Sequence, residues 1–224
     1  MNDNSVSIDV VSDVVCPWCF LGEKRLRAAI AAVGDVDVAV RWRPFQLDPT
    51  IPPEGKDRKE YMRAKFGDGD RLHQIHTNLV SLGAAEGISF DFDAIGVSPN
   101  TLDAHRVIRW AGTMGAAVQN RLVEDLFSRY FERGENTGDA GVLVEAAKAA
   151  GMDTAVVETL LPTDADADAV RAEINTAAQM GITGVPCFLL EGKYAVMGAQ
   201  ETAVLADAIR QIAAAKAKGE LGAG

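Results

Sequence analysis

The stretch SDVVCPWC, residues 12–19, places two cysteines, separated by two residues, between a predicted strand and a predicted helix. Residues 5–13 are rich in Val and Ile, which favours a strand. Residues 36–45, VDVAVRWRPF, alternate as a second strand does. A strand, a helix and a strand in this order form a βαβ unit with parallel strands. Apolar residues at helical spacing in residues 17–33 predict the helix, which faces the core with Trp18, Leu21, Leu26, Ile30 and Val33.

The middle of the chain, residues 57–161, has a different pattern. Gly and Pro interrupt several short helical segments, and we expect four to six helices here. Residues 88–92 predict one short extended piece. The block follows a Pro-rich loop at residues 47–55, and no flexible linker separates it from the rest of the chain. We therefore expect it to pack against the other elements.

The C-terminal part returns to mixed elements. Its pattern predicts a helix at 166–180, a strand at 185–190, a turn at 191–193, a strand at 194–197, a helix at 201–215 and a frayed tail at 219–224. The two strands form an antiparallel hairpin and complete one four-stranded mixed sheet with helices on both faces. The sequence therefore predicts an α/β domain from residues 1–56 and 162–224, with residues 57–161 as an inserted all-helical domain.

Cys16 and Cys19 stand at the N-terminus of the first predicted helix, and this position determines their chemistry. Free N–H groups and the helix dipole favour a negatively charged sulfur there. Pro17 fits the first turn, where its missing N–H costs nothing. Cys19 lies one turn further on the same face, close enough to form a disulfide. We therefore expect Cys16 to attack a substrate disulfide, and Cys19 then to attack Cys16 and release the product.

Two alternatives remain for the cysteine pair. One C-x-x-C is half of many zinc sites, and His73, His76, His105 and Cys187 are the remaining candidate ligands. The sequence contains no second close pair, so we expect no metal site, and we expect His73 and His76 to be solvated surface residues. The pair could also be chemically inert.

A second signal is GVPCF, residues 184–188. A Pro that opens a strand after a β-branched residue suits a cis peptide bond, and a trans Pro at a strand edge is the alternative. Beside the cysteine pair, the backbone of Val185 would offer hydrogen bonds to an extended substrate. Pro17, Trp18, Val185 and Pro186 are therefore candidates for substrate binding, with plain core packing as the alternative for Trp18.

Composition narrows the function classes. The net charge of −10 argues against general nucleic-acid binding, because such proteins usually show a basic face. The start MNDNSVSIDVV lacks the basic residues and long apolar core of a secretory signal, and no run of about 18 apolar residues predicts a membrane span. Three cysteines are too few for a secreted disulfide framework. We therefore expect a cytoplasmic protein without membrane or nucleic-acid partners.

These motifs together resemble one family. CPWC after SDVV, GITGVPCFLL, KYAVMGAQ, PNTLDAHRVIRWA, EDLFSRYFERGENTGD, WRPFQLDP and EGKDRKEYMRAKFG are similar to the FrnE-like branch of the DsbA family over nearly the whole chain. The resemblance implies a thioredoxin-like fold with a large inserted all-helical domain. It also implies thiol–disulfide exchange with peptide or small-molecule substrates, and often a homodimer. No resident cofactor is implied, and glutathione is a candidate redox co-substrate.

Related lineages supply a second hypothesis. The hydroxychromene-carboxylate isomerases and kappa-class glutathione transferases usually carry Ser where this chain has Cys16, and they use glutathione. The chain would then be a glutathione-dependent isomerase or transferase whose helical block forms a small-molecule pocket. A third hypothesis is a redox-switched binding module, in which the disulfide only changes a surface.

Two positions depart from the family pattern. Thioredoxins bury an acidic residue under the active site, where this chain has Val10, and Asp13 is the nearest group that could assist proton transfer. A strand-end cap is the alternative for Asp13. FrnE-like proteins usually have no cysteine after the cis-Pro, where this chain has Cys187. That residue either lies within reach of Cys16 or is a small buried hydrophobic residue, which we favour.

The start of one helix in the block adds secondary candidates. Residues 99–106 border the active-site groove in the family pattern, which points to Asn100, His105 and Arg106. The alternative for each is a capped core helix with a hydrogen-bonded His. Arg41 and Arg43 on the second strand are expected only to be solvated.

Overall fold

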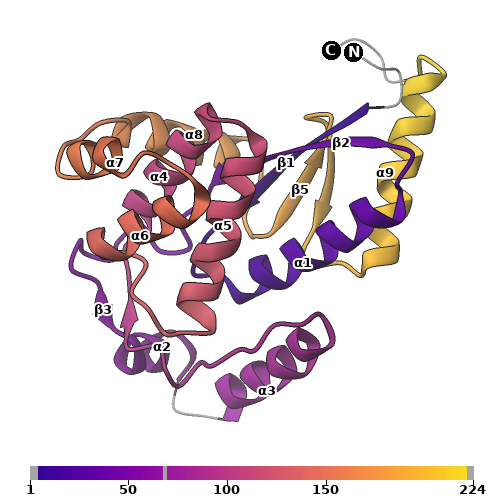
Figure 1. Ribbon diagram of the computed structural model, residues 1–224. Coiled ribbons are helices and arrows are strands. Elements are labelled where there is room, and N and C mark those ends of the chain that lie inside the picture. Colours follow the sequence, from indigo (N-terminus) through magenta and orange to yellow (C-terminus); the bar gives the residue numbers. More distant parts are fainter. Residues whose placement is uncertain (1–4, 68–69, 221–224) are drawn as a thin grey trace.

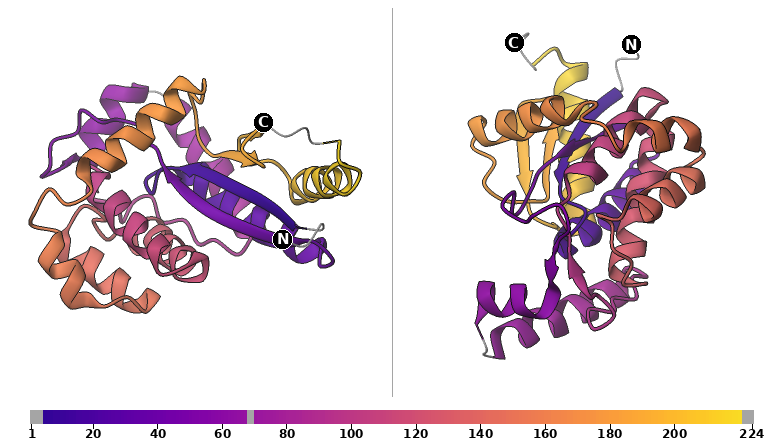
Figure 2. Two further views of the ribbon diagram at one scale, coloured as in Figure 1. Left: turned by 90° about the horizontal axis from the view of Figure 1, so that it is seen from above. Right: turned by 90° about the vertical axis from the view of Figure 1, so that its left-hand side faces the viewer.

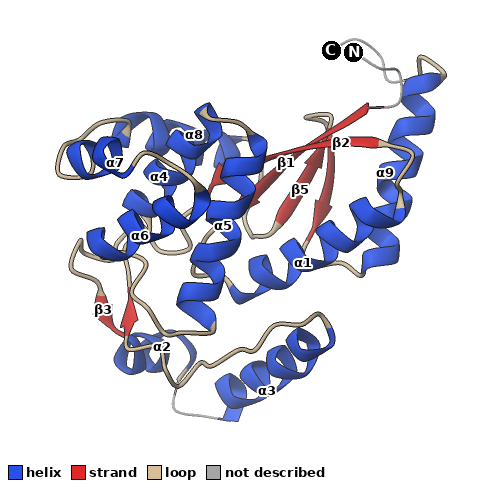
Figure 3. Cartoon of the chain, viewed as in Figure 1, coloured by secondary structure: helices blue, strands red, loops and turns tan. Residues whose placement is uncertain are grey.

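The computed structural model describes residues 5–67 and 70–220. Its main sheet has the strand order β2-β1-β5-β6 (Figures 1 and 3). The strands are β1 (Ser5–Ser12), β2 (Asp37–Pro44), β5 (Cys187–Leu190) and β6 (Tyr194–Met197). β1 runs parallel to β2 and antiparallel to β5, and β5 runs antiparallel to β6, so the predicted βαβ unit, hairpin and mixed sheet are confirmed. Of the predicted frayed tail, residues 221–224 lie outside the described part.

Different helices cover the two faces of the sheet. They are α1 (Pro17–Ala32), α9 (Thr202–Ala217) and α8 (Ala167–Gln179), each within two residues of its predicted bounds. α1 and α9 pack side by side against alternate residues of β1, from Val6 to Val10 (Figure 1). α8 lies over the opposite face, where Ala177 packs with Val11 of β1 (Figure 2). Successive side chains of β1 point to opposite faces of the sheet, so this alternation determines which helix each residue packs against.

Six helices occupy the described part of residues 57–161, at the upper end of the predicted number. They are α2 (Arg58–Phe66), α3 (Asp70–Ala85), α4 (Leu102–Thr113), α5 (Ala116–Phe131), α6 (Ala140–Ala150) and α7 (Thr154–Leu160). No helix in the described residues is both long enough and apolar enough to cross a membrane.

The extended piece predicted at residues 88–92 is wrong. These residues form a loop, because the N–H of Asp91 donates to the carbonyl of Phe131 at the end of α5, at 2.8 Å, rather than to a strand. The short antiparallel pair of this region instead joins β3 (Lys56–Asp57) to β4 (Val97–Ser98). Elements of two residues are too short to produce a periodic pattern in the sequence.

An aromatic cluster joins α1 to the helical block. Phe20 of α1 stacks on Phe127 of α5 with 5.2 Å between ring centroids, and meets the edge of Phe90 at 5.9 Å. Phe131 of α5 packs on the same rings. The sheet and the inserted helices therefore share one hydrophobic core.

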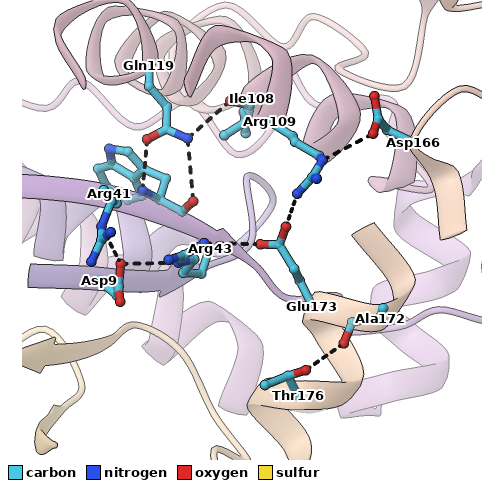
Figure 4. A network of polar contacts seen from close by, with 11 residues as sticks. Asp9, Arg41, Arg43, Ile108, Arg109, Gln119, Asp166, Ala172, Glu173 and Thr176 are labelled. Atoms are coloured by element: carbon cyan, nitrogen blue, oxygen red, sulfur yellow. Dashed lines mark hydrogen bonds and ion pairs between the residues drawn. The ribbon is translucent and has the colours of Figure 1, made fainter. Parts of the chain in front are cut away.

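Gln119 of α5 attaches the helical block to the free edge of β2. Its Oε1 accepts a hydrogen bond from the backbone N–H of Trp42 at 3.0 Å, and its Nε2 donates to the carbonyl of Ile108 in α4 at 3.1 Å (Figure 4). The indole Nε1 of Trp42 donates to Asn120 at 2.7 Å. Because an edge strand otherwise leaves backbone groups unpaired, these side chains both satisfy β2 and fix α4 and α5 against it.

Arg41 and Arg43 of β2 are ion-paired, which corrects the expectation that they are only solvated. Both guanidinium groups contact Asp9 of β1 at 3.1 Å. Arg43 also reaches Glu173 of α8 at 3.5 Å, and Glu173 pairs with Arg109 of α4 (Figure 4). The network connects the sheet to α8 and α4. Its side chains are partly exposed, so each pair contributes about 0–1 kcal/mol.

Arg106 of α4 closes the end of α7. Its guanidinium is 3% exposed and donates to the carbonyls of Leu160, Leu161, Thr163 and Ala165 at 2.7–3.2 Å. Asp103 accepts a further hydrogen bond at 2.7 Å. These carbonyls lie at or just after the end of α7, where the helix has no further N–H groups to offer them, and Thr163 also donates to the carbonyl of Leu160. Arg106 therefore supplies donors where the helix has none.

We predict that Arg106→Met lowers the free energy of unfolding by about 3 kcal/mol or more, because the buried carbonyl bond to Leu161 and three partly buried ones are lost at once. Arg171→Met is the matched control: Arg171 forms one exposed i,i+3 pair with Asp168, and its loss should cost under about 0.5 kcal/mol. Urea denaturation followed by circular dichroism measures both. Equal destabilisation of the two variants would contradict the structural role of Arg106.

Candidate active site

Cys16 is the N-cap residue of α1, directly after β1. Its backbone is extended, with φ −95° and ψ 112°, and Pro17 occupies the first helical turn. The Cys16 N–H donates to the carbonyl of Asp13 at 3.0 Å, and the Cys16 carbonyl accepts from the N–H of Cys19 at 3.0 Å. The turn is thus closed on both sides of the first cysteine, which holds its sulfur at the N-terminal end of the helix.

The Cys16 thiol faces the loop before β5. Its Sγ donates to the carbonyl of Val185 at 3.7 Å, and the Val185–Pro186 peptide bond is cis, the isomer that the sequence predicts. Gly22 of α1 allows this approach, because a Cβ at residue 22 would lie only 3.0 Å from Cγ of Pro186. The two sequence motifs, CPWC and GVP, therefore meet in space.

Cys19 lies beneath Cys16, 1% exposed. Burial raises the pKa of the Cys19 thiol well above its usual value, and its hydrogen bond and charge interaction with Cys16 raise that pKa further. The Ser12 hydroxyl and the Asp13 backbone act in the opposite direction. Cys16, Cys19 and Cys187 are all free thiols. The Cys19 thiol, with its raised pKa, therefore keeps its proton to a higher pH than an ordinary cysteine does.

A cavity of about 320 Å³ opens beside Cys16. Pro17, Trp18 and Val185 line it together with Cys16, whereas Cys19 and Pro186 do not reach its wall. The opposite wall comes from the first two helices of the inserted block: Arg58, Tyr61, Met62 and Phe66 of α2, and Ile75 and His76 of α3. Of the two cysteines in the CPWC motif, Cys16 is therefore the one that a ligand in this cavity can contact.

Asp13 and His105 form a buried polar pair behind the cysteine turn. Their side chains are 1% and 4% exposed, and Asp13 Oδ1 lies 3.5 Å from Nε2 of His105. Asp13 Oδ2 accepts from the N–H of Leu47 at 2.8 Å, and His105 Nε2 also lies 2.8 Å from the carbonyl of Phe45. Asp13 lines the cavity and His105 does not.

A family model described as a DSBA-like thioredoxin domain matches residues 7–210. The chain belongs to this family. It is similar to a probable DsbA oxidoreductase from Streptomyces coelicolor, with a TM-score of 0.85 and 32% identity over 98% of this chain and 92% of that one. The uncharacterized protein YwbO of Bacillus subtilis (strain 168) is 28% identical over 208 residues, 92% of this chain and 96% of the relative.

A likeness in fold alone extends to a 2-hydroxychromene-2-carboxylate isomerase. Its TM-score is 0.69 at 16% identity, over 97% of this chain and 100% of that one. The thioredoxin-like fold with inserted helices is therefore shown.

In this DSBA-like chain the two departures noted in the sequence have different outcomes. Val10 packs in the hydrophobic core at 1% exposure, so the carboxyl group nearest to the cysteine turn belongs to Asp13. Cys187 pairs with Val11 and packs with Ala177 of α8, on the face of the sheet opposite α1. Burial raises the pKa of the Cys187 thiol. Its burial beside Val11 and Ala177 agrees with the small buried residue that we favoured.

All three secondary candidates of this segment, Asn100, His105 and Arg106, lie outside the cavity wall. Asn100 braces a loop: its Nδ2 donates to the carbonyl of Ile51 at 2.6 Å, and its Oδ1 accepts from the N–H of Leu102 at the start of α4. Arg106 serves the end of α7, as described above. In the family pattern their segment borders the groove, but it is the neighbouring Pro99 and Thr101 that line the cavity.

The histidines expected at the surface differ from each other. His73 is exposed, whereas His76 is half-buried and stacks on Phe92 with 4.0 Å between ring centroids. Burial, and then the charge of Arg58, lower the pKa of His76. In the part of the chain that the structure describes, no cluster of three His, Cys, Asp or Glu residues could hold a metal ion.

The sequence did not predict that residues of α2 line the cavity. EGKDRKEYMRAKFG was noted for its resemblance, but its apolar residues predicted only a helix. β3 ends at Asp57 and α2 begins at the next residue, so the β3–β4 pair sets where the helix begins. This starting point decides which apolar residues of α2 are on the side of Cys16.

We predict that reduced protein loses stability as the pH rises above about 8.5, where an unfolded cysteine ionises. Because the pKa of Cys19 is raised in the fold, the unfolded state releases this proton first, and the free energy of unfolding then falls with pH. Cys19→Ser should make this fall shallower by up to about 1.4 kcal/mol per pH unit. Urea denaturation in the presence of a phosphine reductant between pH 7 and 10 measures the slope, and an unchanged slope in the variant would refute the assignment.

Proposed function

We propose that the chain is a thiol–disulfide oxidoreductase in which Cys16 is the nucleophile and Cys19 the resolving cysteine. The observation that carries this proposal is the different access of the two sulfurs: Cys16 lines the cavity, and Cys19 lies buried beneath it. A substrate disulfide in the cavity can be attacked only by Cys16. Placement in the FrnE-like branch stays a prediction from the motifs.

The proposed exchange has two steps. The Cys16 thiolate attacks one sulfur of the substrate disulfide, a mixed disulfide forms, and the other substrate sulfur leaves as a thiolate. Cys19 then loses its proton and attacks Sγ of Cys16, which forms the Cys16–Cys19 disulfide and releases the second substrate thiolate. Run in reverse, the same steps oxidise a substrate dithiol. After the forward reaction, two molecules of glutathione or another small thiol would reduce the Cys16–Cys19 disulfide and leave as their own disulfide, and after the reverse reaction a small disulfide would reoxidise the pair.

The surroundings of the pair support these roles. The raised pKa of Cys19 keeps it protonated while Cys16 reacts. Asp13 is the nearest buried carboxylate, and we propose that it assists removal of this proton in the second step. The carbonyl of Val185, 3.7 Å from Cys16 Sγ, is the strand-like acceptor that an extended substrate would use.

Single cysteine variants separate the roles. The wild-type protein should accelerate the reduction of insulin by dithiothreitol, and Cys16→Ser should abolish this acceleration because no nucleophile faces the cavity. Cys19→Ser should instead accumulate a mixed disulfide with the substrate, visible by intact mass spectrometry. Cys187→Ser is the matched control and should retain the wild-type rate. Full activity in Cys16→Ser would overturn the proposal.

The enclosed cavity also supports a second candidate, a glutathione-dependent isomerase or transferase. Such an enzyme would hold its substrate between Cys16 and α2 and would not need a cysteine at residue 16. Cys16→Ser would then keep its activity and require glutathione. The same variant therefore distinguishes the two candidates.

A further inference from the structure

Arg58 is a buried cation on the wall of the cavity that Cys16 lines. It is the first residue of α2, it is 9% exposed, and its backbone N–H donates to the carbonyl of Gly96 at 3.0 Å. A guanidinium group has five N–H donors and stays charged in proteins. Burying such a charge is costly unless an anion or several acceptors meet it.

The fold provides little to meet this charge. Among the described residues, the guanidinium has one hydrogen bond, from Nη1 to Oγ of Ser98 at the long distance of 3.5 Å. It also lies over the ring of Tyr130, 5.9 Å from the centroid. No carboxylate in residues 5–67 and 70–220 lies within 4.0 Å of its nitrogens. Its position in the first turn of α2 adds to the cost, because the helix dipole disfavours a cation there.

The other buried arginines show what a satisfied guanidinium looks like in this protein. Arg25, 5% exposed, pairs with Glu86 at 2.9 Å and with Glu201 at 3.1 Å. Arg106, 2% exposed, meets Asp103 and four backbone carbonyls. Arg58 differs from both because its guanidinium has no carboxylate or carbonyl partner among the described residues and lies on the cavity wall.

The remaining charged groups of the wall, Asp13, Asp48 and Lys65, each have a hydrogen-bond partner, although Oδ1 of Asp13 is buried without one among the described residues. Asp13 accepts from Leu47 and lies beside His105. Asp48 accepts from the N–H and the hydroxyl of Thr50, at 2.9 and 2.6 Å. Lys65 donates to the Tyr61 hydroxyl at 3.2 Å. Arg58 is therefore the charged group of the wall with the most unused hydrogen-bonding capacity.

Most of the rest of the wall is apolar, although Tyr61, His76, Ser98, Thr101 and Tyr130 add polar side chains. Trp18, Ile51, Met62, Phe66 and Ile75 face the same space. The volume of about 320 Å³ is at the lower end of small-molecule sites, which span roughly 300–1,000 Å³. A compact apolar or aromatic body fits such a wall, with one anionic group for the Arg58 guanidinium.

We propose that this cavity binds a small thiol or disulfide that carries a carboxylate on an apolar body, with the carboxylate at Arg58 and the sulfur at Cys16. This assignment deepens the proposed function, because it names the substrate class of the same site. Arg58 would hold the carboxylate through two parallel N–H···O bonds, which fixes the orientation of the ligand. The apolar wall then directs the sulfur of the ligand toward α1.

The first test measures binding without any redox step. It uses the Cys16→Ser protein with two probes of equal size, 2-(methylsulfanyl)benzoate and its uncharged amide, 2-(methylsulfanyl)benzamide. Trp18 lies on the cavity wall and Trp42 and Trp110 do not, so a change in tryptophan fluorescence that is lost in Trp18→Phe reports occupancy. The carboxylate should bind at least tenfold more tightly than the amide. Equal affinities would overturn the proposal.

Variants of α2 then assign this preference to Arg58. Arg58→Gln should remove the difference between the two probes, and Arg58→Lys, which retains the charge, should keep part of it. Lys59→Gln, which removes the same charge from the next, exposed position outside the cavity, should leave the preference unchanged. If Arg58→Gln does not fold, the comparison of Arg58→Lys with Lys59→Gln still decides, because only the lysine at residue 58 should alter the ratio. A preference that survives Arg58→Gln, or that responds to Lys59→Gln, would refute the site.

The second test follows the reaction in the protein with Cys16 intact. The reduced protein is mixed with 5,5′-dithiobis(2-nitrobenzoate), a carboxylate-bearing aryl disulfide, or with the uncharged 2,2′-dithiodipyridine. Arg58→Gln should slow the first reaction at least tenfold and the second less than twofold. Equal slowing would overturn the role of Arg58. Selective binding in the first test without insulin reduction by the wild-type protein would instead refute only the proposed function.

Discussion

The geometry of the site depends on how β1 passes directly into α1. The carbonyl of Ser12, the last residue of β1, accepts from Phe45 at 3.0 Å, and the next turn closes through Cys16 N–H to Asp13. Because strand, turn and helix are consecutive and hydrogen-bonded, the backbone of Cys16 cannot shift without moving the sheet. The same rigidity holds Cys19 beneath it, where burial keeps that thiol protonated. The unequal chemistry of the two cysteines therefore follows from one strand–helix junction.

Chemistry and recognition come from different parts of the chain. The proposed nucleophile Cys16, the proposed resolving Cys19 and the Val185 carbonyl belong to the sheet and its flanking segments. The far wall of the cavity belongs to the inserted helices, whose first residue Arg58 is positioned by the β3–β4 pair and by its hydrogen bond to Gly96. The insertion is fixed to the sheet through α5, by Gln119 and by the Phe20–Phe127 stack. Changes in α2 could therefore alter the substrate class while the exchange chemistry stays the same.

The structural features that could be predicted from the sequence are those determined by residues close together in the chain. The β1–α1 junction, the hairpin and the cis bond before Pro186 each depend on residues next to one another, and their patterns are visible in a few letters. The role of Arg106 and the lack of a partner at Arg58 depend on residues up to 59 positions away, and no local signal distinguishes two such arginines. The face of Cys187 follows from its pairing with Val11, which becomes certain only when the strand order is known.

In an acidic protein, a cation inside a cavity favours anions through the charge pair that it forms with the bound ligand, and not through long-range electrostatic attraction. The net charge of −10 repels an approaching anion, but salt screens that field over about 8 Å at physiological ionic strength. Arg58 is enclosed, and a charge pair formed inside a cavity of low polarity is screened much less. Added salt would therefore speed the approach of an anionic thiol by weakening the repulsion, while it would weaken the bound contact far less. Selection among thiols in such a site occurs through how long each stays bound at Arg58, within reach of Cys16.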